Sequence, residues 1–193
     1  MTAICIGTMQ VLANRWLALA VEEASAKLVA CTSSDISSQS AEKSLKNTLH
    51  RLNQIRMVDD TLQSPRLITI GDQLIQLIKG KGHQFTLDEI SQRNWSSARS
   101  IISQKLLEVP RGKVISYGGL AKQSRSSPRG VGIVMRSNPV PWAIPCHRVI
   151  HSDGKLGKLG GTVSGTKEKA RILQAEGVPF NRDGTVKEQA IIS

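Results

Sequence analysis

The sequence predicts an α+β fold in two domains, residues 1–90 and 91–193, and three observations support this prediction. Short apolar runs rich in β-branched residues fill the first half, whereas apolar residues at helical spacing prevail in the second. The second half has 17 basic and 6 acidic residues, against 9 of each in the first. With 39% apolar residues among 193, the chain can form two small cores. We expect an α/β-type first domain with a small sheet and helices, and a mostly helical second domain with a helix-turn-helix.

The first domain is expected to place its strands before its helices. Apolar, β-branched runs flank a turn at Asn14-Arg15 and the polar residues 22–27, which predicts strands. Leucine and isoleucine at helical spacing predict helices, and Gly80-Lys81-Gly82 ends the second one. The expected elements are strands within residues 2–12 and 15–31 and helices at residues 41–57 and 71–79.

The second domain begins near Gln92 with a helical stripe. Pro110-Arg111-Gly112 ends that helix, because proline and glycine interrupt regular structure. Two short helices joined by a tight polar break then have the outline of a helix-turn-helix, an outline that other helical hairpins share. The residues concerned are the stripe Trp95, Ala98, Ile102 and Leu106, an extended piece at 114–117, and short helices at 118–122 and 128–137.

The second short helix carries two arginines and two glycines. Gly130 and Gly132 each cost up to about 1 kcal/mol relative to alanine in a helix, so a close approach should offset that cost. Arg129 and Arg136, seven residues apart, share one face. The helix therefore fits against a nucleic-acid groove, or alternatively packs closely on the core with two solvated arginines. Asn138-Pro139 ends it.

The net charge of +11, confined to the second half, indicates a phosphate-rich partner such as DNA or RNA. The alternative is a solvated basic surface that aids solubility. No stretch approaches the roughly 18 apolar residues of a membrane helix, and the start MTAICIGTMQ lacks a signal-peptide pattern, so we expect no membrane partner. Three cysteines do not form a secretory disulfide framework. An intracellular location follows, cytoplasmic, or nuclear in a eukaryote.

One cysteine has a histidine directly beside it. Residues 145–149 read Pro145-Cys146-His147-Arg148-Val149. A thiol is a strong nucleophile only as the thiolate, and a nearby imidazole can supply the base that produces it. Taken alone, the pair equally describes a packed small hydrophobe beside an ordinary imidazole.

Three blocks of sequence resemble the O6-alkylguanine-DNA alkyltransferases, that is, the methylated-DNA–protein-cysteine methyltransferases. They are Arg129-Gly130-Val131-Gly132, Met135-Arg136-Ser137-Asn138-Pro139 and Ile144-Pro145-Cys146-His147-Arg148-Val149, with 17 residues from Arg129 to Cys146. Ser116-Tyr117 and Leu173-Gln174-Ala175-Glu176-Gly177 lie where the family has its tyrosine and glutamate. The resemblance is strong over residues 109–180 and only architectural over the first 90.

The resemblance implies direct reversal of DNA alkylation. The lesion, O6-alkylguanine with O4-alkylthymine as a further candidate, is flipped from the duplex, and its alkyl group passes irreversibly to Cys146 in a single turnover. His147 would take the thiol proton through a water, and Glu176 would orient and stabilise the imidazole. Tyr117 would donate to the purine, and Asn138 would tie the helix-turn-helix to the active-site strand.

The resemblance also assigns the binding residues. Arg129 would enter the base stack while its helix lies in the minor groove, a route that deforms DNA without reading its sequence. A monomer is expected to act on double-stranded DNA. The remaining DNA contacts would be Arg136, Ser137, Gly132 and Ser152, and the lesion pocket would include Met135, Val149, Pro145 and Ser164.

No cofactor or metal is expected. Cys5, Cys31, His50 and His83 could supply zinc ligands, but their spacing contains no Cys-x-x-Cys or His-x-x-x-His pair. A Cys5–Cys31 disulfide between neighbouring strands is an alternative.

Two other functions are alternatives to alkyl transfer. One is a helix-turn-helix regulator or lesion sensor without chemistry, although sensors related to this family lack the acceptor cysteine. The other is a cysteine hydrolase, for which Cys146 and His147 would be poorly placed, because adjacent residues of a strand point to opposite faces.

Overall fold

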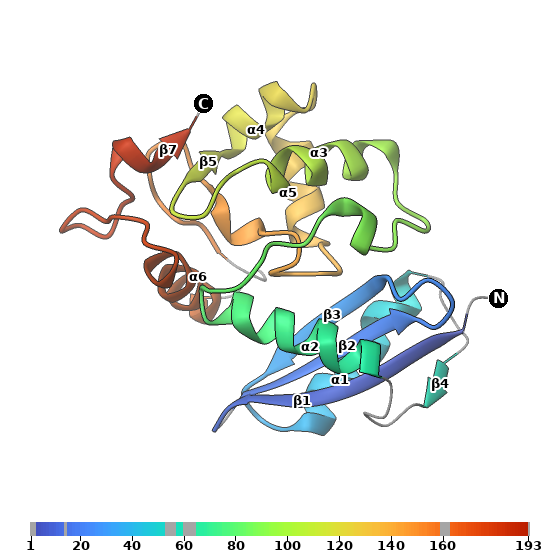
Figure 1. Cartoon of the computed structure of the whole chain (residues 1–193). Helices are drawn as coiled ribbons and strands as arrows, with labels where there is room; N and C mark the ends of the chain where they lie inside the picture. The colour runs from blue at the N-terminus through green and yellow to red at the C-terminus, as the bar shows by residue number, and fades with distance from the viewer. Residues whose placement is uncertain (1–2, 14, 53–56, 60–64, 159–162, 193) are drawn as a thin grey trace. The chain divides into compact units, whose positions relative to one another are not determined.

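The computed structural model describes residues 3–13, 15–52, 57–59, 65–158 and 163–192. They form two compact units of mixed helix and strand, which confirms the predicted fold class (Figure 1). The first unit comprises Met1–Gln76, Phe85–Asn94 and Pro139–Ala143, and the second comprises Leu77–Gln84, Trp95–Asn138 and Ile144–Ser193. The domain boundary expected at residue 90 stays a prediction. None of the described helices is long and apolar enough to cross a membrane.

The first unit is built on a four-stranded sheet in the order β3-β2-β1-β4. The strands β1, β2 and β3 pair antiparallel as a meander, with turns where the sequence predicts them, while β4 pairs parallel with β1. Their bounds are Ile4–Leu12 for β1, Arg15–Glu22 for β2, Leu28–Ser34 for β3 and Met57–Asp59 for β4.

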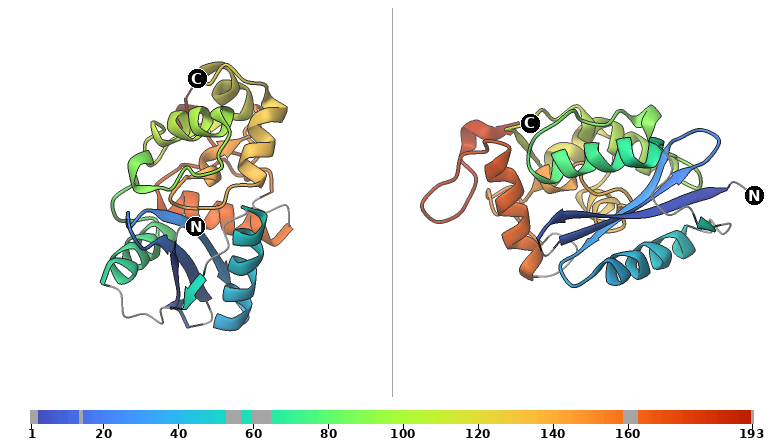
Figure 2. Two further views of the ribbon diagram at one scale, coloured as in Figure 1. Left: turned by 90° about the vertical axis from the view of Figure 1, so that its right-hand side faces the viewer. Right: turned by 60° about the horizontal axis from the view of Figure 1, so that its bottom comes forward.

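Two helices cover this sheet, α1 (Ser38–Arg51) on one face and α2 (Pro65–Ile78) on the other (Figure 2). The apolar stripe of α1 is buried against alternate residues of β1 and β2, as the period of two in a strand requires, and against β3 where a register shift interrupts the alternation. On the other face, Gly7 of β1 lets α2 come close, because a Cβ there would lie 2.6 Å from Leu67 Cδ2. The α1-side core consists of Ile4, Ile6, Ala18, Ala20, Val29, Ala30, Ala41, Leu45 and Leu49.

Two predicted helix bounds in this unit are wrong. The helix expected to reach Met57 ends at Arg51, and Met57 instead begins β4, where it pairs with Ile4. The helix expected to begin at Gly71 begins at Pro65, since proline is well tolerated in the first helical turn. Sequence periodicity did not detect that first turn.

The second unit contains a three-stranded sheet in the order β6-β5-β7, together with helices. The central β5 pairs parallel with both neighbours, so the predicted extended piece is the middle of a small sheet. The strands are β5 (Val114–Ser116), β6 (Val149–Ile150) and β7 (Ile191–Ile192), and the helices are α3 (Ser97–Leu107), α4 (Tyr117–Gln123), α5 (Pro128–Arg136) and α6 (Val163–Ala175).

The helix-turn-helix outline corresponds to α4 and α5, which pack against each other. Both begin at a serine N-cap whose hydroxyl accepts a backbone hydrogen bond: Ser116 from Gly119, and Ser127 from Gly130. The stripe expected to start at Trp95 is shorter. Ser96 caps α3, so Trp95 precedes the helix, and only Ile102 and Leu106 of the four stripe residues are buried.

The alternative of a Cys5–Cys31 disulfide is wrong. Neither thiol forms a disulfide. The premise of neighbouring strands fails, because β2 lies between β1 and β3. Two strand spacings amount to about 10 Å, beyond the reach of a disulfide.

Candidate active site

Cys146 lies in a single 3₁₀ turn, η2 (Cys146–Arg148), immediately before β6. The Arg148 amide donates to the Pro145 carbonyl at 2.8 Å and closes the turn, and the three side chains of the turn are buried. The description of these residues as a strand is therefore wrong. In a 3₁₀ turn the side chains of Cys146 and His147 do not have to point to opposite faces, so this objection to a cysteine hydrolase no longer holds.

The Cys146 thiol is 8% exposed. Burial raises its pKa, while a hydrogen bond with Asn138 and the nearby Lys169 charge oppose that rise. The net shift is upward, so the resting sulfur is a protonated thiol that needs a base before it can attack.

His147 and Glu176 are paired beside the thiol. His147 Nε2 lies 3.0 Å from Glu176 Oε1 in a buried contact. Burial acts to raise the pKa of Glu176, but hydrogen bonds and charges from His147 and Arg148 lower it to about 2. An ionised carboxylate only accepts, so Nε2 carries the proton and Nδ1 is left as the basic nitrogen. Burial also lowers the pKa of His147, so the imidazole is neutral near neutral pH.

Arg148 is the second partner of Glu176 and was not predicted as a site residue. Its guanidinium is 2% exposed and binds the carboxylate in a fork, Nε to Oε2 at 2.9 Å and Nη2 to Oε1 at 2.8 Å. Nη1 donates to the Val109 carbonyl at 2.9 Å. A fork of this kind fixes both the position and the ionisation of the carboxylate that holds His147.

Lys169 is the other site residue that sequence reasoning missed. It lies in α6, is 1% exposed, and donates from Nζ to the Val149 carbonyl at 2.5 Å. Burial lowers its pKa to about 8, against the opposing charge of Cys146. At neutral pH the ammonium is therefore charged and electrostatically coupled to the thiol. Its position in α6, seven residues before Glu176, was the available signal, but spacing alone could not show its burial.

Asn138 connects the end of α5 to the reactive turn. Its Nδ2 donates to the Ile144 carbonyl at 3.0 Å, and its side chain is hydrogen-bonded to Cys146. These two contacts connect the end of α5 to the 3₁₀ turn and to the segment before it, whereas the sequence predicts a connection to a strand.

Tyr117 is the first residue of α4 and is partly buried. Burial raises the pKa of its phenol, and the charge of Cys146 raises it further. The hydroxyl therefore keeps its proton at neutral pH and lies within electrostatic range of the sulfur. Cys146, His147, Glu176, Asn138 and Tyr117 are thus brought together in the second unit.

The predicted DNA-contacting residues in and directly after α5 differ in exposure and in hydrogen bonding. Arg129 and Arg136 are exposed. A Cβ on Gly132 would meet nothing within 4 Å among the described residues, so internal packing does not require this glycine. Ser137 is engaged internally: its hydroxyl donates to the Ile133 carbonyl at 2.7 Å and accepts from Arg99 Nη2 at 2.8 Å.

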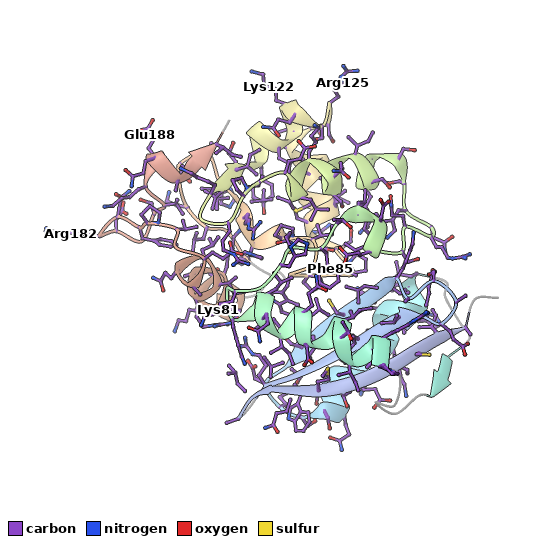
Figure 3. The ribbon with its side chains drawn as sticks, viewed as in Figure 1. Lys81, Phe85, Lys122, Arg125, Arg182 and Glu188 are labelled. Carbon is purple, nitrogen blue, oxygen red and sulfur yellow. The ribbon has the colours of Figure 1, made fainter. Side chains whose placement is uncertain are left out.

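Further basic side chains lie near this helix. Lys122 of α4 and Arg125 of the following turn project outward from the unit (Figure 3). Neither was predicted as a site residue. Their exposure adds positive charge to the helix-turn-helix formed by α4 and α5.

The predicted pocket residues divide by burial. Met135, Val149 and Pro145 are buried, with Met135 8% exposed and Val149 fully covered. Ser152 is exposed in the turn after β6. Ser164 falls within α6, but its side chain lies outside the described part of the structure. Among the described residues, no group of three or more His, Cys, Asp or Glu side chains is arranged to hold a metal ion.

Comparisons with known proteins relate this site to one family. Residues 97–178 match the family described as 6-O-methylguanine DNA methyltransferase, DNA binding domain. The chain is 50% identical over 70 residues to a methylated-DNA–protein-cysteine methyltransferase of Thermococcus kodakarensis, which covers 36% of this chain and 38% of that protein. Identity to the protein of the same name in Methanopyrus kandleri is 35% over 98 residues, covering 50% of this chain and 72% of that protein.

Structural similarity extends further than sequence similarity. The crystal structure of an O6-methylguanine-DNA methyltransferase from the archaeon Pyrococcus kodakaraensis superimposes with a TM-score of 0.67 at 25% identity. That match covers 91% of this chain and 99% of the other. The likeness in sequence therefore centres on the half of the chain that contains the reactive turn, whereas the fold is shared almost throughout.

Proposed function

Because the chain belongs to the family of methylated-DNA–protein-cysteine methyltransferases, we propose that it repairs DNA by taking the alkyl group of O6-alkylguanine onto Cys146. One observation carries this proposal: the buried Cys146 thiol has a proton acceptor, a cation and a proton donor around it. His147 is the acceptor, Lys169 the cation and Tyr117 the donor.

The proposed reaction is a displacement at the alkyl carbon. The sulfur of Cys146 forms a bond to that carbon, the bond from carbon to guanine O6 breaks, and its electron pair stays on the purine. The thiol proton passes to His147, through a water as the family resemblance implies, and Glu176 stabilises the imidazolium. Tyr117 supplies its proton to the purine, and the tyrosinate then regains a proton from solvent while the imidazolium of His147 releases one to solvent. The net change moves one proton from the sulfur to guanine and one alkyl group from guanine to the sulfur. The thioether does not revert, so each molecule acts once.

We propose that double-stranded DNA binds across α5, in the minor groove. The exposed Arg129 and Arg136 on one helix face and the open space at Gly132 support a close approach of the phosphate backbone. Arg129 fills the stack after the lesion rotates out. Ser137 contributes less, since its hydroxyl already has two partners.

Label transfer tests the proposed function. Duplex DNA containing O6-methylguanine with a labelled methyl group is mixed with the protein, and label on the protein is counted. One equivalent of label is expected on wild type and none on Cys146→Ala, while the control Cys5→Ala keeps full transfer. Absence of stoichiometric transfer, or transfer that survives in Cys146→Ala, would overturn the proposal.

Arg129→Ala tests the DNA contact separately. Transfer from duplex DNA is expected to slow by about tenfold or more, because flipping costs a few kcal/mol that the inserted side chain offsets. Transfer from the free base O6-benzylguanine should be unchanged. Equal losses on both substrates would refute the insertion role.

We propose that the protein acts as a monomer, since one chain supplies every residue of the site. Ultracentrifugation with and without DNA checks this expectation. The proposed compartment is intracellular, where genomic DNA lies. A regulator or sensor without chemistry is disfavoured, because Cys146 is accompanied by the buried pair of His147 and Glu176.

A further inference from the structure

We propose that His151 is a positioning residue for Tyr117, holding the phenol ring where its hydroxyl can protonate the purine. This inference rests on the proposed function and deepens it, since it concerns the group that neutralises the leaving base. His151 is exposed, lies two residues after Val149, and has no part in the relay described above.

The topology places the two residues side by side. The strands β5 and β6 run parallel, and Ser116 is paired with Ile150 at their last step. Tyr117 follows β5 directly and His151 follows β6 directly, so both residues leave the sheet at the same end. Neighbouring strands lie about 4.8 Å apart, which brings consecutive exits within reach of a side-chain contact.

The two rings do meet. Their centroids are 5.4 Å apart and their planes are inclined by 45°. This separation lies within the range at which aromatic rings attract one another. The imidazole therefore restricts the rotation of the phenol about its side-chain bonds, on a tyrosine whose backbone is already held by the Ser116 cap.

The turn that carries His151 is itself well fixed. The His151 amide donates to the Lys155 carbonyl at 2.9 Å, and the Gly154 amide donates to the His151 carbonyl at 3.1 Å. Asp153 Oδ1 accepts from the Lys155 amide at 3.1 Å. These hydrogen bonds hold the backbone that carries the imidazole beside Tyr117.

Gly157 makes room for the same imidazole. A Cβ at residue 157 would lie 2.8 Å from His151 Nε2, and the φ of +67° at that residue also favours glycine. The loop after the turn is thus shaped around the histidine ring. This close approach places the ring against the loop as well as against Tyr117.

Orientation of the donor matters because proton transfer needs hydrogen-bond distance in the transition state. A misplacement of about 1 Å can cost up to 100-fold in rate. A phenol at the end of two rotatable bonds loses that distance easily. Contact with His151 limits this freedom without placing another polar group at the sulfur.

The test is a double-mutant cycle measured by single-turnover transfer from labelled O6-benzylguanine, a free base that does not depend on DNA binding. His151→Ala is expected to slow transfer by about tenfold, and His151→Phe, which keeps a ring, to restore most of the rate. In a Tyr117→Phe background, which lacks the hydroxyl, His151→Ala should cause no further loss.

Several outcomes would overturn the inference. A normal rate in His151→Ala would do so, and so would equal losses in the two backgrounds, which would indicate general destabilisation. Failure of His151→Phe to rescue the rate would argue against ring contact. If His151→Ala does not fold, His151→Leu takes its place in the cycle. Wild type without transfer would remove the proposed function itself, whereas a transferring wild type with an unaffected His151→Ala would remove only this inference.

Discussion

Glu22 in the first unit and Glu176 in the second are both buried carboxylates, 3% and 7% exposed. Burial acts to raise the pKa of each, and in both cases hydrogen bonds and positive charge lower it overall. Their partners differ in kind. Glu22 accepts from the hydroxyls of Ser25 and Ser91, both at 2.5 Å, and from Arg93.

Glu176 is instead held by His147 and by Arg148, both of them buried. The serine hydroxyls around Glu22 do not titrate near neutral pH, and the Arg93 side chain is 60% exposed. Glu22 can therefore only fasten the end of β2 to residues 91–93. Glu176 is coupled to a neutral imidazole that can accept a proton, so it can take part in proton transfer.

The cysteines show the same contrast. Cys31 of β3 is buried, and its Sγ donates to the Pro141 carbonyl at 3.2 Å. Cys146 is equally buried but has Asn138, Lys169 and Tyr117 in interaction with its sulfur. Burial alone therefore does not distinguish a reactive thiol or carboxylate from a structural one. A reactive group is distinguished by titratable side chains that are buried beside it.

The largest expected difference in transfer rate is between Glu176→Gln and Glu22→Gln. Glu176→Gln should slow transfer from O6-benzylguanine by about 100-fold or more, because a neutral amide stabilises the imidazolium poorly. It should also lower the free energy of unfolding by about 3–5 kcal/mol, since Arg148 loses its buried partner. Single-turnover transfer and urea denaturation measure the two effects.

Glu22→Gln is the matched control in the first unit. It should lower the free energy of unfolding by about 1–3 kcal/mol, because hydrogen bonds to a charged group are weakened. Its transfer rate per folded molecule should match wild type. A large rate loss in Glu22→Gln would remove the distinction drawn between the two carboxylates.

Lys169→Met tests the cation beside the thiol. Removing a charge that lowers the pKa of Cys146 should slow alkylation of that residue by iodoacetamide several-fold near neutral pH, because a smaller fraction of the sulfur is then ionised. Mass spectrometry of the Cys146 peptide gives the rate. Lys167→Met, an exposed change in the same helix, should react like wild type. Equal rates in the two variants would contradict a role for the buried ammonium.

A smaller effect is expected in the pH dependence of stability. Burial lowers the pKa of His147 in the folded protein below its ordinary 6.5, so unfolding takes up a proton there once the pH falls to that value. The urea midpoint should therefore fall from pH 7 to about pH 5, and it should fall less in His147→Gln. His50→Gln, an exposed change in α1, should retain the wild-type dependence. An unchanged slope in His147→Gln would show that other groups cause the effect.

The smallest effect is expected for Cys31→Ala. Its transfer rate should stay at the wild-type value, and its free energy of unfolding should fall by about 1 kcal/mol, a common cost for a buried truncation. Label transfer and urea denaturation apply again. Loss of transfer in Cys31→Ala would show that the thiol of the first unit contributes to the reaction.

The sequence by itself determined the features that depend on local chemistry. The tight polar break before Pro128 and the Asn138-Pro139 stop predicted the two short helices, because proline and asparagine act on the backbone within a few residues. The motif around Cys146 and its distance from Arg129 identified the family. Apolar, β-branched runs detected β1, β2 and β3 but not β4, because the pairing of Met57 with Ile4 outweighed the helical spacing that assigned Met57 to a helix.

Only the tertiary structure decided which charged residues surround the thiol. Lys169 and Arg148 look like ordinary basic residues in the sequence, and packing buries them against a carbonyl and a carboxylate many positions away. The contact of Tyr117 with His151 likewise depends on the parallel pairing of β5 with β6. Burial and electrostatic coupling depend on distance in space, and residues separated by 20 or more positions acquire that distance only through the fold.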